Sequence, residues 1–452
     1  MSRGWPLLLG LVVGCGARSG LLVPDPLVDG SDASMDGAID GTADTAGDVA
    51  PDTTLDALED TPVDDSTVEV GDVAPETGDT DALPCAPPTV TTVDLYVDRA
   101  YAGAIHDGSA ACPWSRITDA LAFVGLPSSR RVVHVRGGTS TTPLRYDEPG
   151  ALSIHKNVTL RGDGPTVTHL PVDLGALILH HGGILEGFTI VGDHGVITEG
   201  GYPPADVDAA TLRRATVTGA GGTGTGSPCI SAYGSVHLGP DLVVTGCNNH
   251  GVLATAGDIH VVGTTCTFSD NKSTGITVGV FGRLLFEGGT ASGNSEAGVR
   301  LGARSVSSLK APHLVYGLVA RDNGIAGLDV WTDVPVHVGA STLLHNRFGV
   351  RTTADSGAVL DLGGGLAGAG KNNLGSATLG DRNTHAAVCI DAAHPASIRA
   401  DDNGWSSCAP SFVQKIVPSC ETGSGYADVW YRPASPAATG VPLVASTCTV
   451  GP

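Results

Sequence analysis

A short turn pattern recurs along the second half of the chain and strongly limits what the chain can fold into. At each turn a small residue precedes a β-branched or aliphatic one, and the intervals between successive copies are 34, 22, 24, 23, 29 and 22 residues. Short strand-like runs such as "LVVTGCN" and "CTFSDN" precede the copies, and no helical periodicity separates them. A period in the low twenties made of short strands is typical of a solenoid. The copies are Gly195-Val196, Cys229-Ile230, Gly251-Val252, Gly275-Ile276, Gly298-Val299, Gly327-Leu328 and Gly349-Val350.

This period fits one rung of a three-sided parallel solenoid, in which each side is a short strand and each corner a tight turn. Successive rungs would stack at the strand–strand distance of about 4.8 Å, with apolar side chains pointing inward. The composition agrees, because 64 glycines and an aromatic content of only 4% disfavour long helices and favour many turns. We therefore expect an all-β chain whose main body is a parallel β-helix over residues 89–410.

Asparagines recur at one corner of the expected rungs. Asn271, Asn294 and Asn323 each lie four residues before the glycine of the turn, and Asn248 and Asn346 lie at the neighbouring offset. Asparagine tolerates the left-handed backbone angles of a corner, and stacked asparagine side chains can hydrogen-bond along a ladder. We interpret Asn271, Asn294 and Asn323 as a structural ladder; a polar ligand groove is the alternative.

The start of the folded part differs from the repeat. The segment "LYVDRAYAGAIHDGSAACPWSRITDALAFV" begins with a strand over residues 95–97 and continues with a short helical pattern. Ile117, Leu121 and Val124 share one face of that helix, and Gly125 ends it. "RRVVHVRGGT" predicts a second strand, and "GALSIHKNVTLRGDG" predicts a third and a fourth.

These opening segments, together with the Asn-x-x-Gly-Val rungs, resemble right-handed parallel β-helix proteins of the pectate-lyase-like superfamily. More closely, the chain resembles an uncharacterised bacterial β-helix family carried on secreted lipoproteins. The resemblance covers about residues 92–410 and implies a right-handed coil. The superfamily includes polysaccharide lyases, pectin esterases, hydrolases and epimerases, so it implies a fold rather than one activity. Residues 411–452 show no rung pattern, and we expect them to cap the last rung, since an open solenoid end exposes unpaired strand edge.

The N-terminus predicts export and anchoring. "MSRGWPLLLGLVVGC" has one basic residue followed by an apolar run that is too short to span a bilayer and is typical of a signal peptide. Its end, Val12-Val13-Gly14-Cys15, resembles a bacterial lipobox. The resemblance implies that residues 1–15 form a lipoprotein signal and that Cys15 carries a diacylglycerol anchor. A cleaved secretion signal is the alternative. We therefore expect the protein on a bacterial outer membrane or cell surface.

An acidic segment follows. Residues 21–88 hold 15 Asp, 3 Glu and neither Lys nor Arg, so they account for most of the net charge of −22. From Asp32 to Asp64 an aspartate occupies every fourth position. Like charges at this spacing destabilise a helix, and a calcium loop needs ligands two residues apart. A highly charged segment with few large apolar residues cannot offset the entropy of ordering. We interpret residues 16–88 as a disordered acidic tether.

Nine cysteines remain after Cys15, and exported chains usually oxidise their cysteines. Proximity in sequence favours Cys85 with Cys112, Cys389 with Cys408, and Cys420 with Cys448. Two of Cys229, Cys247 and Cys266 are expected to pair across rungs and leave the third buried. The cysteine and histidine spacings suggest no zinc site, so we assign no metal-ligating residue; calcium stays unsupported.

No catalytic group emerges from the pattern. A lyase of the superfamily needs clustered carboxylates and a base, and a hydrolase needs neighbouring carboxylates, but the acidic residues of the rungs are scattered. The aromatic residues of the rungs are expected to lie mainly in the core: Tyr233, Phe281, Tyr316, Trp331 and Phe348. The globular part is nearly neutral, with no basic patch for nucleic acid.

We therefore expect a surface-anchored β-helix lipoprotein without catalytic residues or cofactor, which binds the membrane through its lipid and has an adhesive or glycan-binding role. A polysaccharide lyase or hydrolase-like enzyme is one alternative, and a structural envelope protein is another.

Overall fold

The described part of the chain belongs to one compact unit, Asp79–Pro452, whereas a second unit, Met1–Gly78, lies wholly outside the described residues. Cys15 and the acidic segment up to residue 84 lie outside the described residues, and so does Cys408. The computed structural model describes residues 85–89, 91–172, 177–192, 195–199, 209–219, 227–302, 311–353, 359–363, 370–376, 379–391, 398–400, 403–405, 414–417, 420, 422, 426–432, 443–444 and 448–450.

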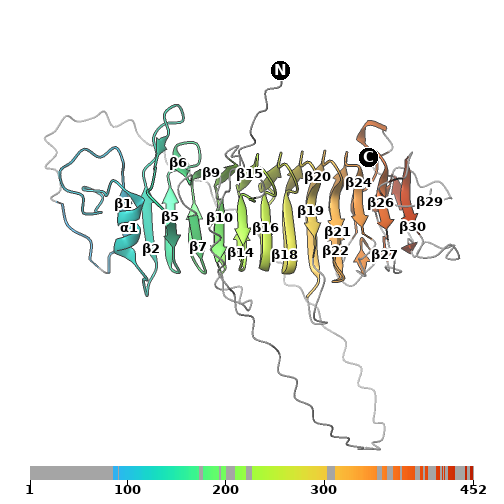
Figure 1. The fold of residues 1–452 in the computed structure, drawn as a ribbon, viewed down its shortest axis with the longest axis horizontal. Coiled ribbons are helices and arrows are strands. Elements are labelled where there is room, and N and C mark those ends of the chain that lie inside the picture. The colour runs from blue at the N-terminus through green and yellow to red at the C-terminus, as the bar shows by residue number, and fades with distance from the viewer. Residues whose placement is uncertain are drawn as a thin grey trace, which may run out of the picture. The chain divides into compact units, whose positions relative to one another are not determined.

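Three parallel sheets run along this unit, and successive turns of the chain contribute to sheets 1, 2 and 3 in that order (Figure 1). Sheet 1 is formed by β1 (Asp94–Val97), β2 (Arg131–Val135), β5 (Val158–Gly162), β8 (Ile184–Glu186), β11 (Ala210–Arg213), β14 (Val236–Leu238), β22 (Val336–Gly339), β25 (Leu360–Asp361), β27 (Ile398–Arg399) and β31 (Leu443–Val444).

Sheet 2 is formed by β3 (Leu144–Arg145), β6 (Thr168–Pro171), β9 (Thr189–Gly192), β12 (Thr216–Gly219), β15 (Val243–Thr245), β17 (Thr267–Ser269) and β23 (Thr342–Leu344), with β28 (Asn403–Trp405) and β32 (Cys448–Val450) beyond a bridge at Asn373. Sheet 3 is formed by β4 (Leu152–Ile154), β7 (Leu177–His180), β10 (Val196–Glu199), β13 (Ile230–Ala232), β19 (Ala297–Leu301), β21 (Ala326–Val330), β24 (Phe348–Thr352), β26 (Ala386–Asp391), β29 (Gln414–Ile416) and β30 (Ala427–Arg432).

Three longer strands pass around corners and serve more than one sheet. They are β16 (Val252–Val262), β18 (Ile276–Ser292) and β20 (His313–Arg321). The first part of β18 pairs in sheet 3, its middle in sheet 1 and its end in sheet 2. The sequence predicted a separate short strand on each side, and here the corners are smooth enough for the ladder to continue through them. The all-β parallel β-helix is confirmed.

The repeated turns predicted from the sequence lie in register on sheet 3. Val196 pairs with Ile230, Ile230 with Val252, and the pairing continues through Ile276, Val299, Leu328 and Val350. All of these side chains are fully buried in one interior column. A stack of aliphatic side chains removes apolar surface from water at every rung, which is the main stabilisation available to such a fold.

Glycine is required at the turns of the middle rungs because neighbouring rungs approach too closely there for a side chain. A Cβ on Gly275 would lie 2.6 Å from the carbonyl oxygen of Gly298, and one on Gly298 would lie 2.8 Å from that of Gly327. Both distances are below van der Waals contact. The small residue of the repeat is therefore set by the stacking of rungs, not by the local turn alone.

The N-terminal end of the solenoid is covered by the helix α1 (Ile117–Val124). Ile117 and Ala120 are fully buried, and Leu121 and Val124 pack against the core. Glu148 accepts hydrogen bonds from the backbone N–H groups of Ile117 (2.7 Å) and Thr118 (3.2 Å), and so satisfies donors that a helix start leaves without an intrahelical partner. The expected N-terminal cap is present.

The C-terminal segment differs from the expected cap. Within residues 411–452, β30, β31 and β32 pair in parallel with β26, β27 and β28, so they add a further rung. β29 pairs with β30, and Val417 and Cys420 pack with Phe348 and Trp430 in a second apolar cluster. The segment thus both extends the coil and covers part of sheet 3, which its irregular sequence did not reveal. Among the described residues, no helix is long and apolar enough to cross a membrane.

Candidate functional site

The outer face of sheet 1 carries a cleft at its first rungs, near β1 and β2. Its volume is about 270 Å³. Tyr96 pairs with His134 across the ladder, and His134 with Arg161. Because side chains alternate along a strand, the residues two positions further on face the same side. The cleft is lined by Tyr96, Val97, Asp98, Ala110, Pro113, His134, Arg136 and Asp163.

The polar groups of this cleft, which we call the sheet-1 cleft, are held by one another. The Arg136 guanidinium donates to Asp98 (3.0 Å), whose other oxygen accepts the backbone N–H of Ala100 (2.8 Å). Asp98 is only 5% exposed, whereas the side chain of Arg136 is 70% exposed. The guanidinium is therefore held in place by Asp98 while most of the side chain is exposed to solvent. It has further N–H groups that can donate to a ligand.

The aromatic side of the sheet-1 cleft is equally ordered. The rings of Tyr96 and His134 stack with centroids 5.0 Å apart and planes inclined by 15°. His134 Nε2 lies 2.8 Å from a carboxylate oxygen of Asp94. This carboxylate holds the imidazole in place. The cleft thus presents an imidazole, a phenol, a guanidinium and two carboxylates from consecutive rungs.

A buried carboxylate continues the same face. Glu186 on β8 is fully buried and pairs with Arg161, with Arg213 (2.7 Å) and with Arg214 (2.7 Å). Burial alone would raise the pKa of Glu186, but hydrogen bonds from the three arginines outweigh burial and lower the pKa to about 2. Glu186 is therefore ionised at neutral pH and unsuited to act as a general acid. Its role is to fix three guanidinium groups beside the cleft.

A second buried ion-pair group lies on sheet 3. Asp329 is fully buried and accepts hydrogen bonds from Arg300 (3.0 Å) and twice from Arg351 (2.8 Å each). The Arg300 guanidinium also lies over the Trp331 ring, 5.1 Å from its centroid. Asp329 was one of the scattered acidic residues of the sequence. Its oxygens are occupied by structural partners, so it lines no open site.

The expected asparagine ladder is formed. Asn271 donates to Asn294 (2.8 Å), and Asn294 to Asn323 (2.9 Å). The ladder continues to Asn346 (2.9 Å), which in turn lies 3.4 Å from the oxygen of Asn383. All members are buried, which contradicts the alternative of a ligand groove at this corner. Asn248 lies outside the ladder; its side chain accepts a hydrogen bond from Lys272.

The disulfides match the expectation in part. Cys85 is bonded to Cys112, and Cys229 to Cys247. Cys266 is free and buried, and burial raises the pKa of its thiol to about 11. The pairing of Cys389 with Cys408 is wrong, because Cys389 is bonded to Cys420.

The pairing of Cys420 with Cys448 is therefore also wrong. β30 returns to sheet 3 beside β26, and this brings Cys420 onto the outer face, where the Cys389 side chain points. The side chain of Cys448 lies outside the described residues.

The rung aromatics are more exposed than expected. Phe348 is buried, but Tyr233, Phe281 and Trp331 are exposed by 54%, 47% and 42%. These three follow sheet-3 strands at one corner, two rungs apart in each case, or about 10 Å by the stacking distance. Placing them in the core was wrong, because at this corner their side chains face solvent.

One group of three potential metal ligands occurs within the described residues, namely Cys85, Cys112 and Asp107. Its two cysteines are joined in the disulfide, so their thiolates are not available.

The sequence pattern predicted no catalytic residue and did not reveal the residues of the sheet-1 cleft. Three strand ends carry the signal: "YVD" (residues 96–98), "HVR" (134–136) and "RGD" (161–163) each place a polar group on either side of an inward residue. Aligning them requires knowing that β1, β2 and β5 are consecutive in one sheet, and their spacing is irregular. The long loop after β1 hides this register in the sequence.

Comparisons with known proteins find no matching family model and no matching curated protein. Three solved structures share the general fold. The A-module of the Azotobacter vinelandii mannuronan C-5 epimerase AlgE4 is 15% identical, with a TM-score of 0.43 over 79% of this chain and 100% of that chain.

The A-module of the epimerase AlgE6 from the same organism is 16% identical, with a TM-score of 0.37 over 73% and 93%. The pectate lyase Pel9A is 12% identical, with a TM-score of 0.30 over 80% and 79%. The names describe the activities of those proteins, and nothing about the activity of this chain follows from them.

Proposed function

We propose that this protein binds polysaccharide at the sheet-1 cleft. The observation that supports it is the convergence of Tyr96, Asp98, His134, Arg136 and Asp163 in a hollow of about 270 Å³. A concave site with a few fixed polar groups is the usual form of a ligand site. Hydroxyl groups of a sugar can donate to the carboxylates and accept from the guanidinium.

The exposed guanidinium of Arg136 favours a polysaccharide that carries carboxylates. Four arginines and four carboxylates lie on this part of the face, and the side chain of Arg136 is the most exposed of the arginines. Arginine can bind a sugar carboxylate through two parallel hydrogen bonds. The arginines are Arg136, Arg161, Arg213 and Arg214, and the carboxylates are Asp94, Asp98, Asp163 and Glu186.

We further propose that the protein is held at a bacterial outer membrane or cell surface by a lipid on Cys15. The signal-like N-terminus and the lipobox resemblance support this anchor. The tether of residues 16–88 would then hold the solenoid away from the bilayer, because like charges keep such a segment extended.

A second candidate function is polysaccharide cleavage in the same cleft. It is favoured by the imidazole of His134 and the phenol of Tyr96, which can exchange protons with a sugar ring, beside a guanidinium that can neutralise a carboxylate. A lyase would remove a proton from a uronic acid residue and expel the glycosidic oxygen.

One experiment tests both functions. The purified protein is titrated with a panel of acidic and neutral polysaccharides, with and without calcium, while the release of unsaturated and reducing ends is followed. The variants are Arg136→Gln, which keeps a donor for Asp98, and the matched control Arg321→Gln, which removes an exposed arginine from sheet 2.

Binding that weakens at least about tenfold in Arg136→Gln, equivalent to about 1.4 kcal/mol, and stays unchanged in Arg321→Gln supports the sheet-1 cleft. Equal binding by both variants would place the glycan elsewhere. Release of new chain ends would make the protein an enzyme. Failure to bind any member of the panel would refute the proposal and leave a structural role in the envelope.

A further inference from the structure

A charged residue interrupts the aliphatic interior at the N-terminal end of the solenoid. Arg131 begins β2, pairs with the buried Val158 and is only 8% exposed. Side chains alternate along β2, and Val133 and Val135 point inward with no exposed surface, so Arg131 points inward as well. In later rungs of sheet 1 the corresponding inward position is aliphatic, as at Val236 and Ile259.

The guanidinium of Arg131 has no counter-charge among the described residues. Its Nη1 atom is buried without a hydrogen-bond partner, and no carboxylate lies within ion-pair distance in the described part of the chain. A buried, unpaired charge is costly, so most buried cations in proteins have an anionic partner. The C-terminal end of α1 nearby offers a favourable dipole but supplies no acceptor to Nη1.

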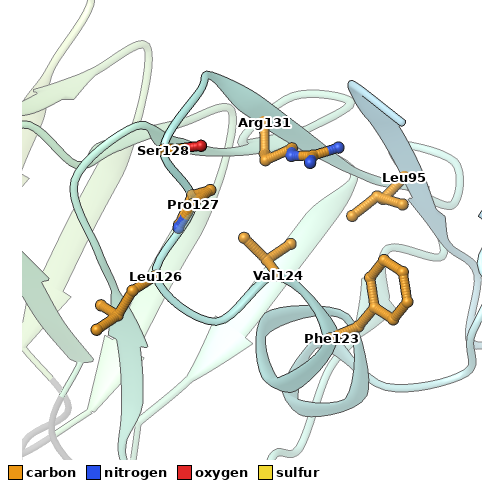
Figure 2. Close-up of a pocket in the computed structure, with 7 residues that line it drawn as sticks. All are labelled: Leu95, Phe123, Val124, Leu126, Pro127, Ser128 and Arg131. Atoms are coloured by element: carbon orange, nitrogen blue, oxygen red, sulfur yellow. The ribbon is translucent and has the colours of Figure 1, made fainter. Parts of the chain in front are cut away.

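The same guanidinium lines a cavity of about 220 Å³ (Figure 2). Leu95 comes from β1, Phe123 and Val124 from the last turn of α1, and Leu126, Pro127 and Ser128 from the loop that follows (Figure 2). The loop side of the wall is tied to the next rung, because the Asn157 amide donates to the Pro127 carbonyl (3.2 Å). The cavity is therefore half open, with apolar side chains placed around one cationic group.

We propose that this cavity binds a small organic carboxylate with an apolar body, of the size of a substituted benzene ring. A carboxylate can receive two parallel hydrogen bonds from the guanidinium and would supply its missing counter-charge. An apolar protein cavity of about 150 Å³ accommodates benzene, so this cavity of about 220 Å³ has room for a ring and a carboxylate. The site is separate from the sheet-1 cleft, since the two share no lining residue.

The test is isothermal titration of the purified protein with benzoate, phenylacetate and isovalerate, against the uncharged isostere benzamide and against sodium chloride. We expect saturable binding of at least one carboxylate and at least about tenfold weaker binding of benzamide, a loss of about 1.4 kcal/mol. Arg131→Met should abolish carboxylate binding. The matched control Arg130→Met, which removes an exposed arginine from the adjacent loop position, should leave it unchanged.

A second pair of variants guards against misfolding of Arg131→Met. Ser128→Phe should fill the cavity and block binding while Arg131 stays in place, and Ser129→Phe, at an exposed neighbouring position, should not. Equal binding of benzamide and benzoate, persistence of binding in both Arg131→Met and Ser128→Phe, or binding of none of the three carboxylates would overturn the proposal. Binding of chloride alone would also overturn it, because the site would then select a bare anion.

Discussion

Individual polar residues hold the rungs of this protein together at their corners. The side-chain oxygen of a ladder asparagine accepts from the preceding rung and its amide donates to the following one, as in Asn294 between Asn271 and Asn323. Asn294 also donates to the Phe268 carbonyl (3.1 Å). A column of such residues satisfies backbone groups that the tight turns would otherwise leave unpaired in the interior.

Replacing Asn294 by leucine should lower the free energy of unfolding by about 1–3 kcal/mol, because Asn271 and the Phe268 carbonyl lose buried partners. Urea denaturation followed by circular dichroism measures the change. The control is Asn248→Leu, at a half-buried corner position outside the ladder, and it should cost less. Equal losses in the two variants would contradict a special role for the ladder.

Glu186 should make the free energy of unfolding depend on pH in the acidic range. Its pKa in the folded protein is about 2, below the ordinary value of 4.5, so its ionised form favours folding. This contribution, about 3 kcal/mol for a shift of this size, is complete above pH 4.5 and is lost as the pH falls towards 2. Denaturation midpoints at pH 7 and pH 3 measure it.

The Glu186→Gln variant should be less stable than the native protein at pH 7, and its stability should fall less between pH 4.5 and pH 2. The half-exposed Glu199→Gln serves as control. An unchanged pH dependence in Glu186→Gln would show that the three arginines do not stabilise the carboxylate.

At the scale of elements, long-range contacts stabilise segments whose own sequence lacks local stabilising residues. The start of α1 has Arg116 at its N-cap position without a side-chain cap, and Glu148 from a loop 31 residues downstream of Ile117 takes that role. β29 and β30 are consecutive in sequence and pair in parallel. Cys420 lies between these two strands, and its disulfide with Cys389 ties this part of the chain to β26. These contacts define both ends of the described unit.

The Cys389–Cys420 disulfide can be tested directly by peptide mapping without reduction, which should give a cross-linked fragment containing these two residues. The Cys420→Ala variant should lose about 2–4 kcal/mol of local stability in the C-terminal strands. Trypsin should then cut after Lys415 in β29 faster than in the native protein, and cutting after Arg130 should not change. A fragment linking Cys389 to Cys408 would contradict the structure.

At the scale of the whole molecule, the candidate binding features occupy different parts of one solenoid. The sheet-1 cleft lies on the first rungs, and the exposed rings of Tyr233, Phe281 and Trp331 follow one corner of the middle rungs. Repeating rungs space such groups regularly, which suits recognition of an extended polymer better than of a single sugar.

The proposed lipid anchor on Cys15 also belongs to the scale of the whole molecule. Replacing Cys15 by serine should release the protein from the membrane fraction into the soluble one, because lipid attachment requires the thiol. Fractionation of cells expressing each form, detected by antibody, measures the change, and Cys266→Ser is the matched control because Cys266 is buried in the solenoid. If the Cys15→Ser protein stays with the membrane, the lipoprotein interpretation is wrong.

The sequence by itself determined the rung, its register on sheet 3 and the asparagine ladder, because a solenoid stacks residues that are one period apart and makes long-range contacts periodic. Val252 and Ile276 could be matched by counting along the chain, and so could Asn271 and Asn294.

Only the tertiary structure decided what lies where the period fails. The sheet-1 cleft joins β1 and β2, which a loop and a helix separate in sequence, and Arg131 shares a cavity with the end of α1. Cys420, which follows β29, is bonded to Cys389 on β26. These contacts depend on how irregular segments pack against the coil, and no spacing in the sequence encodes that packing.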